Sequence, residues 1–567
     1  MDATNGHDLS ATRRCLRVPE LQHIIFDMIY RQFDGPCTLA ALARTARCFL
    51  DVALDTLWNT QTSLIPLVKC FPQDLWIETR DGDGFRVVSL VAEPKPEDWT
   101  RVKLYAARIR DITLSASVLS SQRLEGKLAG DAFVTLKTSL GSEPFLPNLH
   151  SFAWEQAQGE EAHALASFQL MLSPHASSMN VKMNKWSDDS AEAIATALNE
   201  YGEKAVQLRS ITVLYTSPTW KCPPIEKAVL ALGFRQQNLQ ALVCTWQNKM
   251  SLETITQLSK LNTLQKVSIK ADRATTTQLL EIARSTSGTF FSSLRLLSLH
   301  TDTLALCEDW LHAIRSSALD SLTFIVDEPP TTDELHAFLA RLAAPSHRLH
   351  SGKLHQLRLV SRKAAPRPSS LHHVTPATLE PLLPLDLTAL QLEPGCPVDV
   401  DDAFIERAAR AWPRLRTLEL AAELRRYAGA PRVTLSGLFP LAQHCPELST
   451  LGLPFVADAG AFQPRFDAGD RPTDGVSFGL DAPFTLGVGG SMINQGTDTF
   501  LLAGVLSDLC PSLRSVQTAW NRVGKVAGAN VGRLEVELDD MADSWRQIDR
   551  FAVEMARVRR QERMWME

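Results

Sequence analysis

The segment AWPRLRTLEL at residues 411–420 decides the fold of this chain. After the proline, leucines stand at 415, 418 and 420 in the pattern Leu-x-x-Leu-x-Leu. The last two leucines alternate with polar residues, as the buried face of a β-strand requires. Apolar residues at helical spacing precede them over Asp402–Trp412. The segment therefore predicts a helix, a turn and a strand in that order.

The same leucine pattern, with Ile, Val or Phe allowed, returns along most of the chain. Copies begin at residues 109, 149, 208, 239, 264, 294, 319, 354, 387, 415, 448 and 513. Weaker copies begin at Ser178 and Pro483, near the middle of the two longest gaps. Most neighbouring copies lie about 25 to 40 residues apart, which is typical of leucine-rich repeats or slightly longer.

Helical patterns separate the copies, at 191–201, 225–234, 252–261, 274–283, 333–342, 402–412 and 498–509. Strand, helix and strand in succession favour parallel pairing with right-handed crossovers. One such unit cannot bury its own apolar face, so the units must stack. We therefore expect an α/β protein in which residues 109–530 form an irregular leucine-rich-repeat solenoid, shaped as a horseshoe.

Residues 14–71 have a different pattern, which predicts three short helices. Pro19 suits a first helical position, and apolar residues follow at Leu21, Ile24, Ile25, Met28 and Ile29. Gly35 and Pro36 precede a second helix with Leu39, Leu42, Ala43 and Ala46, and a third contains Val52, Leu57 and Trp58. So small a core cannot bury all these apolar positions, so a partner is expected to cover some of them.

This N-terminal segment resembles an F-box, the helical module that docks on the Skp adaptor of cullin-type ubiquitin ligases. Val18-Pro19-Glu20 stands where the family has a Leu/Ile-Pro opening, and Leu57-Trp58 stands where the family ends on Leu-Trp. Residues 39–49 resemble its middle helix. The repeats in which Trp412, Cys445 or Cys510 precedes proline are similar to those of fungal-type F-box/leucine-rich-repeat proteins. Val at position 18 and the scarcity of Asn after the strands depart from the family patterns.

The resemblance implies a substrate-recognition subunit of an SCF-type ubiquitin ligase. It implies a Skp-family adaptor, and through it a cullin, as partners, together with an unknown target protein held by the repeats. The residues that it places at the adaptor are Val18, Pro19, Glu20, Ile25, Leu39, Leu42, Leu57 and Trp58. Two alternatives remain open: a leucine-rich-repeat scaffold without ligase association, and a leucine-rich-repeat GTPase activator.

Three further segments lie outside the regular repeats. Residues 72–108 predict a linker hairpin and helix, and the Gly-, Asp- and Pro-rich segment 457–490 predicts a loop insertion. Residues 531–567 predict an amphipathic helix, with Met541, Ile548 and Met555 seven residues apart. Such a helix would cap the last repeat, and a coiled coil that dimerises the chain is the alternative.

Target binding is expected at the outward positions of the strands, between the buried leucines. Candidate residues at these positions are Lys270, His300, Arg358, Gln391 and Glu419. The earlier strands are basic and the later ones mixed or acidic, and such a gradient would orient a partner. Simple solvation of these polar residues is the alternative interpretation.

Composition excludes several other classes of protein. The net charge of −6, without a long block of one sign, argues against nucleic-acid binding. No apolar stretch of membrane-spanning length and no signal peptide is expected. The ten cysteines form no Cys-x-x-Cys pair, which indicates a reducing compartment, cytoplasm or nucleus. Because hydrolase and zinc-site motifs are missing, we expect no enzymatic activity, cofactor or metal.

Overall fold

The computed structural model describes residues 18–566 apart from residues 33, 83, 116–125, 157–160, 206, 218–219, 286–289, 315, 317, 345–353, 366–370, 422–430, 480–481, 494–496 and 520–530. These residues form two compact units, Met1–Asn248 and Lys249–Glu567. Each unit contains parallel strands that alternate along the chain with helices. Asn521, a candidate for the asparagine that follows the strand in the family pattern, lies outside the described residues, as do His347 and His350, which form a local histidine pair in the sequence.

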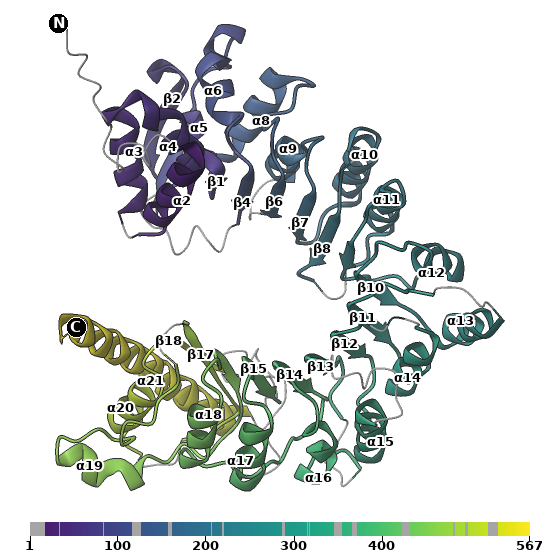
Figure 1. Cartoon of the computed structure of the whole chain (residues 1–567), viewed down its shortest axis with the longest axis vertical. Coiled ribbons are helices and arrows are strands. Elements are labelled where there is room, and N and C mark those ends of the chain that lie inside the picture. Colours follow the sequence, from purple (N-terminus) through teal and green to yellow (C-terminus); the bar gives the residue numbers. More distant parts are fainter. Residues whose placement is uncertain are drawn as a thin grey trace, which may run out of the picture. The chain divides into compact units, whose positions relative to one another are not determined.

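The first unit begins with three helices and continues as a parallel sheet. The helices are α2 (Pro19–Tyr30), α3 (Gly35–Thr45) and α4 (Arg47–Asn59). The sheet has the order β1-β4-β6-β7-β8-β9, with β1 (Thr60–Gln61), β4 (Asp111–Leu114), β6 (Ser151–Glu155), β7 (Ser178–Met183), β8 (Ser210–Tyr215) and β9 (Ala241–Cys244). The connecting helices are α8 (Gly130–Leu140), α9 (Glu161–Met171), α10 (Asp188–Lys204) and α11 (Pro223–Phe234). Figure 1 shows α10 and α11 on one side of β7 and β8.

A hairpin and a short helix connect the three helices to this sheet. Short helix α5 (Ile65–Val68) precedes strands β2 (Trp76–Arg80) and β3 (Arg86–Leu90), which pair antiparallel. A 3₁₀ turn at Pro96–Asp98 then leads into α6 (Trp99–Ala106), and β5 (Lys127–Leu128) pairs parallel with β3. Residues 72–108 thus contain both a hairpin and a helix.

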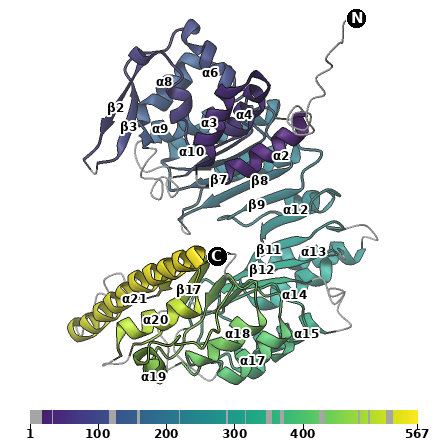
Figure 2. The ribbon, with the colours of Figure 1, turned by 60° about the vertical axis from the view of Figure 1, so that its left-hand side comes forward.

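The second unit repeats the strand–helix alternation. Its strands run in the order β10 (Lys266–Lys270), β11 (Leu296–Thr301), β12 (Ser321–Val326), β13 (Gln356–Ser361), β14 (Ala389–Glu393), β15 (Thr417–Leu420), β16 (Thr450–Gly452), β17 (Phe484–Gly489) and β18 (Leu513–Thr518). The helices are α12 (Leu252–Ser259), α13 (Arg273–Ser285), α14 (Leu304–Ala313), α15 (Thr332–Ala343), α16 (Pro376–Leu379), α17 (Asp402–Ala411), α18 (Phe439–His444), α19 (Gln463–Asp467), α20 (Thr499–Leu509) and α21 (Val531–Met566). Figure 2 shows α17 and α18 together in the helical layer.

The leucine pattern forms the core of this sheet. Val267, Leu297, Leu322, Leu357, Leu390, Leu418 and Leu451 are register partners from strand to strand, and all are buried. Their neighbours along each strand face the other side, because side chains alternate across a strand. The weaker copies also form strands, β7 and β17. The predicted α/β repeat solenoid is confirmed.

Proline ends the helices in three of the repeats at the same place. Trp412, Cys445 and Cys510 follow α17, α18 and α20 with nearly identical backbone angles, φ between −118° and −121° and ψ between 64° and 72°. A residue before proline avoids the helical region for steric reasons, and proline has no N–H to continue the helix. The chain therefore turns into the next strand at each of these positions.

Main-chain hydrogen bonds join successive strands where they begin. The carbonyl of His355 accepts from the amides of both Thr388 and Ala389, and the carbonyl of Thr388 accepts from Arg416 and Thr417. The same doubled bond recurs in the first unit, where the Ser177 carbonyl accepts two amides of the next strand. The Thr388 hydroxyl also donates to the His355 carbonyl, at 3.2 Å, so backbone amides and a side chain together join the repeats where their strands begin.

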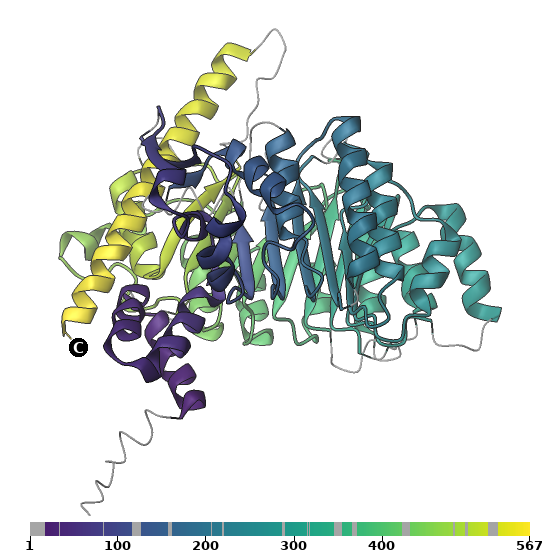
Figure 3. The same ribbon diagram turned by 90° about the horizontal axis from the view of Figure 1, so that it is seen from above.

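Helix α21 lies against the last strand of the second unit. The Asp549 carboxylate accepts the β18 amide of Val516 at 2.6 Å, and the Trp545 indole donates to the Ser491 carbonyl at 3.0 Å. The buried Trp545 ring also packs edge-on against Phe455. Figure 3 shows the length of this helix, whose side chains are described over residues 540–563 and at residue 565. Leu534 and Leu538, which stand seven residues before Met541 and Trp545, fall outside the described side chains.

Two segments differ from the expected boundaries. Residues 457–490, expected as a loop insertion, contain a 3₁₀ turn at Gly460–Phe462, helix α19 and strand β17, so only part of the segment is loop. Residues 60–71, expected within the F-box segment, form β1 and α5, and β1 pairs with β4 of the sheet. A strand of two residues is too short to show an alternation of apolar and polar residues in the sequence. It is recognised only from its pairing with β4 in the structure.

Candidate interaction surfaces

The three N-terminal helices have a small apolar core. Phe26, Leu39, Ala43, Val52 and Ala53 are its buried members, and the Phe26 and Phe49 rings meet edge-on at 5.7 Å between centroids. Gly35 lets α3 begin close to the end of α2, because an added Cβ would lie 2.3 Å from the Ile29 carbonyl oxygen. These contacts fix the directions of the three helices.

Helix α2 presents a second apolar face, which the core does not use. Leu21, Ile24 and Met28 are spaced i, i+3 and i+7, which places them on one side of a helix. Ile24 is 59% exposed and Met28 is 63% exposed. Val18, just before the helix, extends this exposed row. We call Val18, Leu21, Ile24 and Met28 the α2 stripe.

The residues predicted at the adaptor are placed differently from one another. Val18, Pro19 and Glu20 are exposed, and Ile25 and Leu42 are partly buried beside the core. The prediction for Leu39 is wrong, because its side chain is fully buried among the three helices and cannot reach a partner. Leu57 packs against the same core. Leu21, Ile24 and Met28 of the α2 stripe are recognised in the sequence as part of the helical periodicity but are not predicted at the adaptor. Periodicity alone does not show which side of α2 faces inward, because tertiary packing decides it.

Helix α4 is attached to the rest of the first unit at its end. Trp58 stacks on Tyr105 of α6, which covers one face of the indole. The Arg108 guanidinium forms ion pairs with Asp51 and Asp55 of α4. The Arg110 amide then donates to the Asn59 carbonyl at 2.9 Å. Trp58 therefore anchors the three helices to α6, and only part of its surface remains available to a partner.

The second unit has a sheet face opposite its leucine core, which we call the open face. Its central row, in register from β10 to β15, contains Ser268, Ser298, Thr323, Arg358, Gln391 and Glu419. The next row toward the strand ends contains Lys270, His300, Ile325, Val360 and Glu393. The predicted target-binding residues thus form two groups, Lys270 beside His300 and Arg358 beside Gln391 and Glu419.

His300 takes part in a charged cluster at the ends of the strands. Its Nε2 lies 2.9 Å from Oδ1 of Asp327, and the Arg362 guanidinium lies 3.7 Å from the same oxygen. Burial lowers the pKa of His300 more than the Asp327 contact raises it. Burial alone would raise the pKa of Asp327, but His300, Arg362 and Lys270 together lower it. Asp327 and Arg362 follow the strands, outside the repeat pattern that selected the other candidates.

The second group has one engaged pair. The Gln391 amide donates to the Glu419 carboxylate at 2.9 Å, and both side chains are partly buried. Arg358 is exposed beside them, and the structure shows no hydrogen bond or ion pair between it and another described residue. The open face therefore offers a guanidinium that has no partner within the described part of the chain, beside the bonded Gln391–Glu419 pair.

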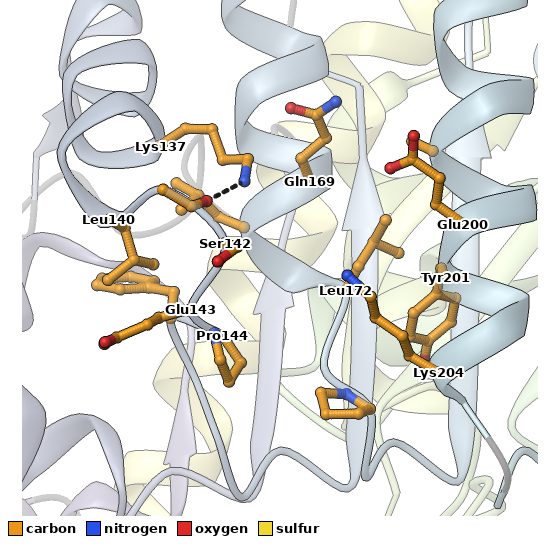
Figure 4. A pocket seen from close by; sticks show the side chains of 15 residues that line it. Lys137, Leu140, Ser142, Glu143, Pro144, Gln169, Leu172, Glu200, Tyr201 and Lys204 are labelled. Atoms are coloured by element: carbon orange, nitrogen blue, oxygen red, sulfur yellow. Dashed lines mark hydrogen bonds between the residues drawn. The ribbon is translucent and has the colours of Figure 1, made fainter.

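A cavity of about 340 Å³ lies in the helical layer of the first unit, between α8, α9 and α10 (Figure 4). Lys137 donates to the Gly141 carbonyl at 2.8 Å, and Glu143 forms an ion pair with Lys103. Tyr201 donates its hydroxyl to the Ser173 carbonyl, and burial raises its pKa. A phenol held in this way is no ready base or nucleophile, because it stays protonated at neutral pH.

Among the residues that the structure describes, no three His, Cys, Asp or Glu side chains gather as metal ligands would. Within the same residues, no helix has the length and apolar character needed to cross a membrane.

Comparison with known proteins finds distant structural likenesses but no sequence relative. No model of a protein family matches the chain, and no curated protein matches it. Among solved structures, it is similar to one described as a crystal structure of the Rad7 and Elc1 complex in yeast. The TM-score is 0.37 at 13% identity, and the match covers 77% of this chain and 89% of the other. A likeness this weak supports no argument, so the fold assignment depends on the strand pairing itself.

Proposed function

We propose that this chain is the substrate-recognition subunit of an SCF-type ubiquitin ligase. In this role the three N-terminal helices dock on a Skp-family adaptor, which links them to a cullin, and the repeats hold a target protein. Ubiquitin transfer belongs to other subunits, and the chain acts by raising the effective concentration of the target near them. The chain itself performs no catalysis.

The observation that carries this proposal is the α2 stripe. Leu21, Ile24 and Met28 expose a continuous apolar row on a small helical module that already has a core of its own. Apolar rows of this kind fit into the hydrophobic groove of a partner. The resemblance of Val18-Pro19-Glu20 and Leu57-Trp58 to F-box positions supports a Skp-family adaptor as that partner.

The test measures binding of the full chain to a purified Skp-family adaptor by biolayer interferometry. A double variant, Ile24→Asp with Met28→Asp, should weaken binding by about a hundredfold or more, since each buried apolar side chain contributes about 1.5 kcal/mol or more. The matched control is Leu104→Asp, because Leu104 is a similarly exposed apolar residue on α6. Point variants are preferable to deletion of the segment, which would also remove β1 and the buried side chains of α5.

The outcomes separate the two leading hypotheses. Strong adaptor binding by the wild-type chain and by Leu104→Asp, with loss in the double variant, would support the receptor. Equal binding by the double variant would contradict docking through the α2 stripe. No binding by the wild-type chain would favour the alternative function, a leucine-rich-repeat scaffold without a ligase.

A further inference from the structure

We propose that the open face of the second unit binds an extended peptide segment in which a carboxylate side chain and an aliphatic side chain are two residues apart, with Arg358 as the central contact. This inference rests on the proposed function, because it names the chemistry of the target that such a receptor would hold.

Arg358 lies in the middle of the open face, between its register partners Thr323 and Gln391. Other arginines beside this sheet are engaged: Arg295 with Asp320, and Arg416 with Glu447. Arg358 is exposed and has no such partner among the described residues. A guanidinium is always charged and offers a planar fork of donors, which matches the two oxygens of a carboxylate.

An apolar pair lies beside this guanidinium. Val360 is two residues further along β13 on the same face, and its register partner on β12 is Ile325. Both side chains are partly exposed. Two residues along a strand span about 7 Å, and an extended peptide repeats its side chains on one face at the same interval. A peptide lying along β13 would therefore place a carboxylate at Arg358 and an aliphatic side chain over Ile325 and Val360.

The charges around this position favour an acidic occupant on one side only. Toward β10 the face contains Lys266 and Lys270, whereas toward β15 it contains Glu393 and Glu419. The Gln391 amide donates to the Glu419 carboxylate, so that acidic group is held on the β14–β15 side, with Gln391 between it and Arg358 in the register. An acidic segment is therefore attracted to the β10–β13 side and repelled from the β14–β15 side, which favours a position along β13 rather than further toward β15.

The probe is a fluorescein-labelled dodecapeptide that repeats Glu-Gly-Leu-Gly, which puts all Glu and Leu side chains on one face of an extended chain. Anisotropy titration with the full chain should show binding that weakens as salt is added. Replacing every Glu of the peptide by Gln, or using the repeat Glu-Leu-Gly-Gly to move the two side chains to opposite faces, should weaken binding by about tenfold.

In the chain, Arg358→Glu should weaken peptide binding by about tenfold or more, and Arg358→Lys should give an intermediate loss because it keeps the charge without the fork. The matched control is Arg410→Glu, because Arg410 is an exposed arginine of helix α17 in the helical layer. Adaptor binding measured on the same preparations should be unchanged by all three substitutions.

Several results would overturn this inference. One is that the wild-type chain does not bind the peptide, and another is that Arg358→Glu binds it as tightly as wild type does. The others are that the wild-type chain binds the Gln peptide as tightly as the Glu peptide, or binds a labelled oligothymidine more tightly than the peptide. If the wild-type chain binds the adaptor in any of these cases, the receptor proposal survives and the carboxylate chemistry alone fails. If the chain binds the peptide but not the adaptor, the proposed receptor function is wrong and the proposed peptide site on the open face stands.

Discussion

Trp58 of helix α4 stacks on Tyr105 of helix α6, with the ring centroids 4.7 Å apart and the ring planes inclined by 23°. The stack joins the three N-terminal helices to the element that precedes β4. It also places a residue of the F-box resemblance in a structural role, beside the ion pairs of Arg108. Changes at this position should therefore act on stability as well as on binding.

We predict that Trp58→Ala lowers the free energy of unfolding of the first unit by about 2 kcal/mol, from lost burial and lost ring stacking. The measurement is urea denaturation followed by far-UV circular dichroism. The control is Trp565→Ala, because Trp565 is 79% exposed on α21 and should cost less than about 0.5 kcal/mol. Equal effects of the two substitutions would show that the stack adds nothing.

Gly35→Ala should destabilise the three N-terminal helices by about 2 kcal/mol. The new Cβ would lie 2.3 Å from the Ile29 carbonyl oxygen and 2.5 Å from that of Tyr30, so the backbone must shift. Gly82→Ala is the control, since nothing lies within 4 Å of its added Cβ. Limited proteolysis should cut Gly35→Ala first within residues 18–59. A protease pattern identical to wild type would contradict the close approach of α2 and α3.

Asp508→Ala should weaken the attachment of α21 to the second unit. Asp508 is 1% exposed and pairs with Arg559 of α21 at 2.6 Å, and it also accepts the Thr473 hydroxyl at 2.8 Å. Removing one partner of a buried ion pair typically costs about 3 kcal/mol or more. Glu554→Ala on the same helix breaks only the exposed pair with Arg557 and should cost less than about 0.5 kcal/mol. The midpoints of urea denaturation test this difference, and equal midpoints would count against it.

The second unit should lose stability as pH falls below neutral. Burial lowers the pKa of His300 in the folded chain, whereas the unfolded chain binds its proton near the ordinary value of 6.5. The stability that comes from neutral His300 is therefore complete above about pH 6.5 and declines as pH falls toward the folded pKa. Asp327 also has a lowered pKa, so its contribution persists until pH approaches its ordinary value of 3.8.

The measurement for His300 is the thermal midpoint at pH 7.5 and pH 5.5. The thermal midpoint of wild type should fall further from pH 7.5 to pH 5.5 than that of His300→Gln. The Gln side chain cannot be protonated but keeps a donor for Asp327. If both proteins lose the same amount, His300 is not responsible for the dependence on pH.

Much of the fold could be predicted, because residues that are close in the sequence specify each strand and each helix end. The alternation of leucines indicates each strand, and proline after Trp412, Cys445 and Cys510 marks where the helices end. The exceptions depend on distant partners. Strand β1 has two residues and exists only through its pairing with β4.

The interaction surfaces were less predictable for a related reason. Helical spacing shows that α2 and α3 are amphipathic, but not which apolar residues the neighbouring helices cover. Leu39 is therefore buried although it was expected at the surface, and Met28 is exposed. On the open face the outward positions followed from alternation, whereas Asp327 and Arg362 come from the segments after the strands, which no period describes.

Helix α21 also bears on self-association of the chain. A last strand with unoccupied amides is a template on which another molecule can add a strand, and such growth leads to aggregates. Here the Val516 amide is already bonded to Asp549, and Trp545 fills the adjoining apolar surface. A chain shortened before α21 would lose this protection, and we expect it to associate through its own sheet.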